Sequence, residues 1–267
     1  MQKSLEITRA YFRDSPEVSK VKDLLEQQWA ALGLNHFEQI MDFTECLGLY
    51  FEELPRSKVS YIALMIMNCH TLANDKFIAM GVDVTEVDIY YIGLLRNYFN
   101  DQEMAYYNKL YKIWVYSCHE EKEVKGALLP DIPIVKQFIW SDWRNVNIGM
   151  SGLMKLVIMI NFSELTGDIV LLQSAIVYTS LKCALLNDIG SILKDKTSTE
   201  SNYYLEIHPD TNVDASTQQG MTDDATNYIM TLQLDERLKT ILKSALHGSY
   251  LLYCFSKRYH GQSKPNW

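Results

Sequence analysis

The stretch from Asp168 to Ala184 is 17 residues long and mostly apolar, a length that fits a helix better than a strand. A helix that is apolar around its circumference belongs inside a protein core. The chain then changes character, because Asn187, Ser191 and Asp195 recur at every fourth position. Residues at this spacing lie on one helical face, about 6 Å apart along the axis. The sequence therefore predicts a buried helix whose end carries three oxygen-bearing side chains in a row.

The rest of the chain shows helical periodicity, without strand-like alternation or an internal repeat. Glycine and proline are few, 12 and 6 in 267 residues, which suits long helices. Gly149 and Gly152 are the expected interruptions of one long helical stretch. We predict a single all-α domain over residues 1–267. Its expected helices, about ten in all, include 16–33, 37–51, 59–80, 85–98, 102–121, 134–162, 168–195, one that starts at 222, and 235–255.

Charge and cysteine content restrict the classes of function. The net charge is −8 and no basic cluster is present, which argues against nucleic acid as a partner because phosphate backbones require a positive surface. The five cysteines are isolated, with no CxxC pair, as is typical of a reduced compartment. Residues 1–6 lack the apolar core of a signal peptide, and no apolar run has membrane-type flanks. We expect a cytoplasmic protein without a transmembrane segment, either a monomer or a homodimer paired through an exposed helix face.

The row of polar side chains at the end of the buried helix has the chemistry of a metal site. It supplies an amide oxygen, a hydroxyl and a carboxylate, which are ligands that Mg²⁺ accepts together with water and phosphate oxygens. Lys194 lies beside them and can reach an anion. A polar helix end that faces solvent is the alternative interpretation. The buried helix before it favours a site, because the polar face then lines the interior.

The segment 187–195, Asn-Asp-Ile-Gly-Ser-Ile-Leu-Lys-Asp, resembles the second metal-binding motif of class I terpene synthases, ND-x-x-S-x-x-K-E. Asp195 stands where the family usually has Glu, and it keeps the carboxylate. The resemblance implies the single-domain helical bundle of the class I terpenoid synthases, with a central active-site cavity. It also implies Mg²⁺ as cofactor, up to three ions, held in part by Asn187, Ser191 and Asp195.

Further family landmarks occur at matching distances from this motif. Arg258 and Tyr259 begin 71 residues after Asn187 and resemble the Arg-Tyr pair that donates to the substrate diphosphate. Arg144, 43 residues before Asn187, resembles the family's diphosphate-sensing arginine. The resemblance thus implies catalytic roles for Arg144, Lys194, Arg258 and Tyr259.

The resemblance places the substrate pocket beside the helix that carries Arg144. Ile148 and Gly149 mark the expected break of that helix, and Trp140 lies one turn before Arg144 on the same face. Because aromatic faces stabilise a carbocation, further candidate walls of the pocket are Phe51, Tyr178 and Tyr253. The alternative is that these rings belong to the ordinary core of a chain that is 12% aromatic.

The first metal motif of the family, an aspartate-rich DDxxD sequence, is incomplete here. Asp75, near the end of the helix predicted at 59–80, is the matching carboxylate and a candidate metal ligand. Asp42 and Glu45 on the preceding helix are a weaker alternative. Three later acidic residues are expected to be solvated: Asp83, Glu86 and Asp88.

The function implied by the resemblance is the Mg²⁺-dependent ionisation of farnesyl or geranylgeranyl diphosphate, followed by cyclisation of the carbocation. Two alternatives remain. One is a relative that uses prenyl diphosphates differently, as a transferase or as an enzyme that acts on a modified substrate. A head-to-tail prenyltransferase is disfavoured, because such an enzyme requires two intact aspartate-rich motifs. The other is a non-catalytic binding protein, which would have no need of the basic residues named above.

Overall fold

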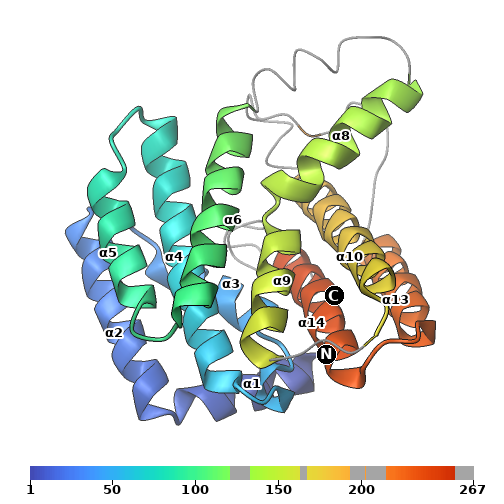
Figure 1. Cartoon of the computed structure of the whole chain (residues 1–267), viewed down its shortest axis with the longest axis horizontal. Helices are drawn as coiled ribbons and strands as arrows, with labels where there is room; N and C mark the ends of the chain where they lie inside the picture. The colour runs from blue at the N-terminus through green and yellow to red at the C-terminus, as the bar shows by residue number, and fades with distance from the viewer. Residues whose placement is uncertain (121–132, 163–166, 193–201, 203–214, 256–267) are drawn as a thin grey trace.

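The computed structural model describes residues 1–120, 133–162, 167–192, 202 and 215–255. These residues form eleven α-helices and one short 3-10 helix, with no strand among them, so the predicted all-α fold class is confirmed. In chain order (Figure 1) the elements are α1 (Gln2–Arg13), α2 (Pro16–Ala31), α3 (Phe37–Leu47), η1 (Phe51–Glu53), α4 (Ser57–Ala79), α5 (Thr85–Leu95), α6 (Asp101–His119), α8 (Pro133–Asn147), α9 (Met150–Asn161), α10 (Ile169–Gly190), α13 (Ala215–Thr231) and α14 (Glu236–Phe255).

Most of these helices begin and end within a few residues of the predicted bounds. The expected break at Gly149 separates α8 from α9, because Gly149 has a φ of 75°, a left-handed conformation that a right-handed helix does not contain. The second predicted interruption is wrong: Gly152 lies inside α9, next to Leu110 of α6. The helix predicted to start at residue 222 begins earlier, at Ala215.

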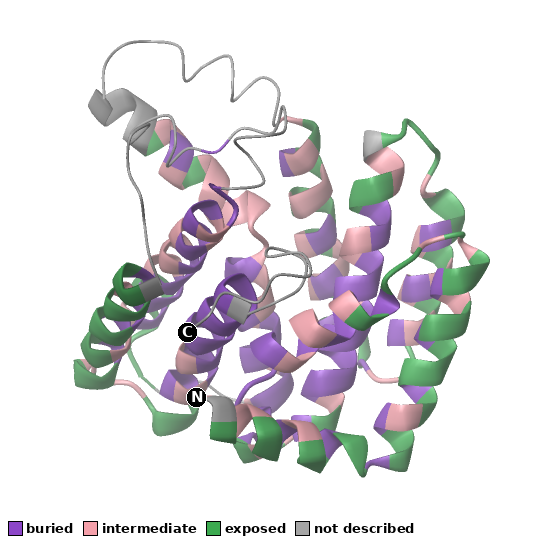
Figure 2. Cartoon of the chain, turned by 180° about the vertical axis from the view of Figure 1, so that it is seen from behind, coloured by how far each residue is buried: buried purple, intermediate pink, exposed green. Residues whose placement is uncertain are grey.

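Two helices organise the packing of the core. α14 packs against α10, α3, α13 and α9, while α4 packs against α5, α2 and α3. In Figure 2 the inner helices are buried along most of their length, whereas the outer helices expose one face. The main hydrophobic cluster draws buried side chains from most of the described helices, among them Phe12, Trp29, Leu64, Leu156 and Leu246. Each such side chain contributes about 1.5–3 kcal/mol, so this cluster is a main source of stability.

α10 is the one helix among the described residues that is long and apolar enough to cross a membrane. The core helix of a water-soluble protein meets the same criteria of length and composition. α10 packs against α14, α9, α13 and α8, as a core helix does. A single helix of this kind is weak evidence for a membrane, and the absence of a transmembrane segment stays a prediction.

Candidate functional site

The predicted metal ligands Asn187 and Ser191 lie at the carboxyl end of α10. The side chain of Asp168 caps the start of this helix by accepting hydrogen bonds from two backbone N–H groups. Ser191 caps its end, and the backbone N–H of Ser191 donates to the carbonyl of Asn187 at 2.9 Å. The two side chains are therefore one turn apart on the same face, as their spacing predicts.

Arg144 of α8 reaches across to this end of α10. Its Nη2 donates to Oδ1 of Asn187 at 2.6 Å and to Oδ1 of Asp188 at 2.5 Å. Its Nη1 donates to Oδ1 of Asn147, in its own helix, at 2.7 Å. The structure thus brings together Arg144 and Asn187, which the sequence resemblance assigned to one site. Figure 1 shows α8 crossing over the upper end of α10.

Asp188 is the residue of this site that sequence reasoning missed. Its side chain is only 4% exposed and forms an ion pair with Arg144. Its second carboxylate oxygen, Oδ2, accepts a hydrogen bond from Nε1 of Trp140 at 3.2 Å. Trp140 and Arg144 lie one turn apart on α8, so one buried carboxylate binds two neighbouring side chains of that helix. The Asn-Asp pair at the start of the motif was the available signal for Asp188. Its position in the sequence does not indicate that Arg144 is the partner.

Ser191 is buried and takes part in a small polar network. Its Oγ donates to the carbonyl of Asp188 at 3.4 Å and accepts from Nδ2 of Asn202 at 3.3 Å. The same Nδ2 donates to the Asp188 carbonyl at 2.6 Å, so Asn202 fixes the end of α10. The amide oxygen of Asn187 and the hydroxyl of Ser191 are hard oxygen donors of the kind that Mg²⁺ binds. No three His, Cys, Asp or Glu side chains in the described part of the chain come together as an alternative metal site.

The break between α8 and α9 lies beside Arg144, and α6 supports it. Nε1 of Trp114, in α6, donates to the backbone carbonyl of Asn147 at 3.1 Å, which satisfies an acceptor that the end of α8 leaves without a helical partner. Ile148 and Gly149 then turn the chain into α9, and Ile148 packs against the main core. Ile148 and Gly149 therefore follow directly after the helix that carries Arg144, and their contact with a substrate stays a prediction.

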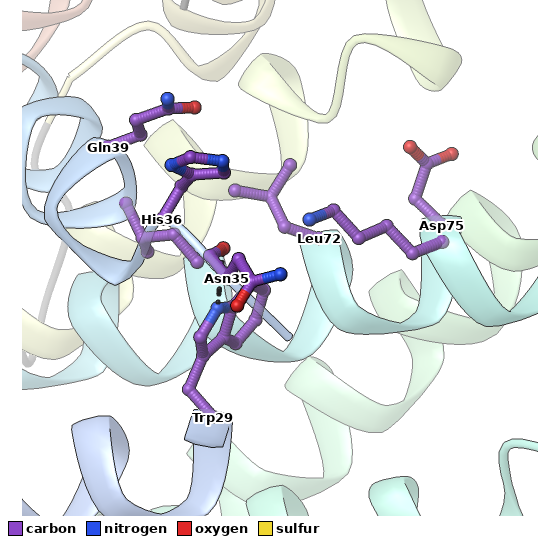
Figure 3. Close-up of a pocket in the computed structure, with 8 residues that line it drawn as sticks. Trp29, Asn35, His36, Gln39, Leu72 and Asp75 are labelled. Carbon is purple, nitrogen blue, oxygen red and sulfur yellow. Dashed lines mark hydrogen bonds between the residues drawn. The ribbon is translucent and has the colours of Figure 1, made fainter. Parts of the chain in front are cut away.

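Asp75 is exposed in the last turns of α4, where it lines a surface pocket of about 100 Å³. Three helices and the loop between two of them form this pocket (Figure 3), which is lined by Trp29, Asn35, His36, Gln39, Ile40, Leu72, Asp75 and Lys76. The ammonium group of Lys76 lies 5.4 Å from the centre of the Trp29 ring. No residue of α10 lines this pocket, so Asp75 and Asn187 do not share it.

The alternative carboxylates Asp42 and Glu45 contact α1. Nε of Arg9 donates to Glu45 at 2.5 Å, and Nη2 of Arg9 lies 3.8 Å from Asp42. These contacts join α1 to α3. They give the two carboxylates a structural role and reduce the case for them as metal ligands.

The expectation that Asp88 is solvated is wrong. Oδ1 of Asp88 accepts hydrogen bonds from Nε2 of His70 at 2.8 Å, from Nδ2 of Asn74 at 2.6 Å and from the Tyr111 hydroxyl at 2.8 Å. Burial acts to raise the pKa of Asp88, but these three hydrogen bonds outweigh it and lower the pKa below its usual value. Asp88 therefore connects α4, α5 and α6 as a charged acceptor.

His70, at the centre of this network, is fully buried in α4. The hydroxyl of Tyr107 donates to its Nδ1 at 2.6 Å, while its Nε2–H donates to Asp88. Both ring nitrogens of the neutral imidazole thus have a hydrogen-bond partner. Burial lowers the pKa of His70 although Asp88 acts in the opposite direction, which keeps the ring neutral near pH 7. The network is a structural clamp between helices.

The remaining aromatic candidates lie in three different environments. Phe51 is buried in the main core. Tyr253 of α14 is buried against Gly190 of α10, where an added Cβ would lie 2.6 Å from the Cβ of Tyr253, so glycine permits this close helix contact. Tyr178 faces Tyr228 of α13, with ring centres 4.8 Å apart. Contact of these rings with a substrate stays a prediction.

Four predicted site residues, Lys194, Asp195, Arg258 and Tyr259, lie outside the described residues.

Comparisons of the chain with protein-family models, with curated proteins and with solved structures find no match. The functional interpretation therefore depends on the motif around Asn187 and on the geometry at the end of α10.

Proposed function

We propose that this protein is a Mg²⁺-dependent class I terpene synthase that ionises farnesyl or geranylgeranyl diphosphate and cyclises the resulting carbocation. One observation carries the proposal: Nη2 of Arg144 lies 2.6 Å from Oδ1 of Asn187. An anion-binding guanidinium and an oxygen donor suited to Mg²⁺ are thereby adjacent at the end of a core helix. Both groups suit a metal-bound diphosphate, because guanidinium groups bind phosphate oxygens and Mg²⁺ bridges oxygen ligands to phosphates.

The reaction breaks the bond between the allylic carbon and the diphosphate oxygen, and the electron pair leaves with the diphosphate. When bound, Mg²⁺ supplies Lewis-acid stabilisation of that leaving group. Asn187, Ser191 and Asp195 would hold it, with Asp75 as a further candidate ligand. The protein's own contribution is a set of charge-assisted hydrogen bonds to the diphosphate oxygens. In this proposal they come from Arg144, Lys194, Arg258 and the hydroxyl of Tyr259.

The carbocation then has to be shielded from water until a proton is lost or a water molecule adds. Ring faces stabilise such a cation by about 0.5–2 kcal/mol each. Trp140 is the best-supported candidate, because its Nε1 bonds to Asp188 and fixes the ring beside Arg144. The helix break at Gly149 lies close by, where the resemblance expects a wall of the substrate pocket.

The test is incubation of the purified protein with Mg²⁺ and geranyl, farnesyl or geranylgeranyl diphosphate. Released diphosphate is assayed enzymatically, and the organic extract is analysed by gas chromatography–mass spectrometry. A cyclic hydrocarbon or alcohol together with stoichiometric diphosphate is expected. Failure to release diphosphate from all three chain lengths would rule the proposal out.

A second candidate is a prenyl-diphosphate enzyme with another outcome, such as transfer to an acceptor. Its motivation is the incomplete first motif, where α4 offers Asp75 without a neighbouring aspartate and that carboxylate is exposed. Repeating the assay with isopentenyl diphosphate distinguishes the two. A longer linear product would select the transferase, whereas a cyclic product that does not depend on the acceptor would select the synthase.

A further inference from the structure

The side chain of Arg144 is bound by two acceptors on α10 that differ in charge. Nη2 donates to the neutral amide oxygen of Asn187 at 2.6 Å and to the carboxylate of Asp188 at 2.5 Å. The side chains of Arg144 and Asp188 are 16% and 4% exposed, so water screens this ion pair little. The positive charge of Arg144 is therefore directed at Asp188.

The amide oxygen of Asn187 has two competing uses. In the structure it accepts a hydrogen bond from Arg144, whereas a Mg²⁺ ligand must point the same oxygen at the ion from about 2.1 Å. A divalent cation there also repels the guanidinium. A cation at Asn187 therefore competes with the Arg144–Asn187 hydrogen bond and weakens it.

Asp188 opposes an anion at Arg144 in two ways. An anion must replace the carboxylate as the partner of Arg144, and it is repelled by the same buried charge. A cation at Asn187 weakens both effects, because it competes for the Asn187 oxygen, repels the guanidinium and offsets the charge of Asp188. The hydrogen bond from Trp140 to Oδ2 of Asp188 does not depend on Arg144 and holds the carboxylate in place.

We propose that Asp188 is a positioning residue that withholds Arg144 from free anions and makes diphosphate binding conditional on a divalent cation. This inference rests on the proposed function and adds a regulation of the same site. Reciprocity follows, because a cation that strengthens anion binding is itself bound more tightly by the same factor, typically about 5–150-fold. Binding would then favour a metal–diphosphate pair over inorganic phosphate or diphosphate alone.

The test measures the affinity of the full chain for inorganic diphosphate by calorimetry, once with EDTA and once with excess Mg²⁺. Asp188→Asn keeps the shape of the side chain and removes its charge. This variant should bind diphosphate about 10-fold more tightly than the wild type in EDTA, and the enhancement by Mg²⁺ should shrink by the same factor. A purely structural role would instead weaken binding in both conditions. Asp224→Asn, at an exposed position of α13, is the matched control and should behave as wild type.

A second measurement needs no variant of Asp188. Nε1–H of Trp140 donates to Asp188, so its indole resonance in ¹⁵N-tryptophan-labelled protein reports on that carboxylate. The Trp140→Phe variant identifies the resonance. It should shift when Mg²⁺ and diphosphate are added together, and stay within its original linewidth when diphosphate is added with EDTA.

The outcomes separate this inference from the proposed function. If the wild type releases diphosphate from a prenyl substrate but Asp188→Asn shows no gain in metal-free affinity, the role of Asp188 is refuted and the function stands. The role of Asp188 is also refuted if the Trp140 indole resonance does not shift at saturating Mg²⁺ and diphosphate. This holds even if Asp188→Asn fails to fold. Absence of both diphosphate binding and prenyl turnover in the wild type overturns the two together.

Discussion

Arg144 and Asp188, 44 residues apart in the sequence, form a 2.5 Å ion pair that joins α8 to the carboxyl end of α10. Both side chains are largely removed from water, and Nε1 of Trp140 adds a third partner. Loss of one member deprives the other buried charge of this ion pair, whereas loss of both removes the two buried charges together.

The first prediction follows from this asymmetry. Arg144→Met should lower the free energy of unfolding by about 3 kcal/mol, and the added substitution Asp188→Leu should recover most of that loss. Urea denaturation followed by circular dichroism measures both. If Arg144→Met alone is as stable as the wild type, then solvent reaches Asp188 and the ion pair is not buried in solution.

The second prediction concerns the metal ligand at the end of α10. Asn187→Ala should reduce Mg²⁺-dependent diphosphate release by at least about 10²-fold and leave the far-ultraviolet circular dichroism unchanged. The control is Asn227→Ala, which removes the same side chain at an exposed position of α13. Full activity of Asn187→Ala would show that the metal assignment is wrong.

The third prediction distinguishes the two candidates for the first metal motif. Asp75→Asn should lower the same activity by about 10²-fold if Asp75 is a ligand. Asp42→Asn should change it less than about 3-fold, because Asp42 lies 3.8 Å from Arg9 in a long, partly exposed pair that contributes little. The reverse order of effects would move the motif to α3.

The all-α fold could be predicted because helical periodicity is encoded locally, whereas one contact of the site was expected from a motif resemblance. Apolar periodicity identified α10, and Gly149 identified the break, since a left-handed residue cannot continue a helix. The adjacency of Arg144 and Asn187 followed from the motif resemblance. α1 was not predicted, because it adds few side chains to the core, among them Thr8 and Phe12.

The environments of Asp188 and Asp88 could not be predicted, for a common physical reason. Each carboxylate is satisfied by partners on other helices, and a spacing along one helix does not indicate those partners. Asp88 follows a glycine turn and resembles a surface residue in sequence, yet His70 and Asn74 of α4 and Tyr111 of α6 surround it. Contacts between helices therefore determine the environments of Asp188 and Asp88.

The fourth prediction compares two glycines. Gly149→Ala places a Cβ 3.7 Å from the Trp114 ring, an ordinary contact, so its cost comes from the left-handed backbone and should be about 1–2 kcal/mol. Gly93→Ala, in the exposed interior of α5, should instead stabilise by about 0.5–1 kcal/mol. Thermal unfolding of both variants provides the measurement. Equal effects of the two would contradict the conformation assigned to Gly149.

The fifth prediction concerns His247 of α14 and the dependence of stability on pH. Its Nδ1 lies 3.1 Å from the Tyr50 hydroxyl and its Nε2 lies 3.0 Å from Oγ1 of Thr226, so the neutral ring is satisfied on both sides. Burial, followed by the positive charge of Lys243, lowers the pKa of His247 to about 4.

In the unfolded chain the pKa of this histidine returns to about 6.5, so the unfolded state binds the proton first as the pH falls. The contribution of His247 to stability is therefore complete above pH ~6.5 and is lost progressively toward pH ~4, by about 2 kcal/mol after allowance for solvent screening. His70, whose pKa is also lowered by burial, acts in the same direction. Asp88, with a pKa below its usual value, adds its own loss only at more acidic pH.

His247→Gln isolates the share of this one residue, because glutamine keeps polar groups near Tyr50 and Thr226 but does not titrate. Urea unfolding at pH 7.5, 6.5, 5.5 and 4.5 should give a difference between wild type and variant that shrinks as the pH falls. The remaining slope of the variant then belongs to His70 and to the carboxylates. A difference that stays constant across this range would show that His247 is protonated equally in the folded and unfolded states, and that its buried position does not control the acid sensitivity of the fold.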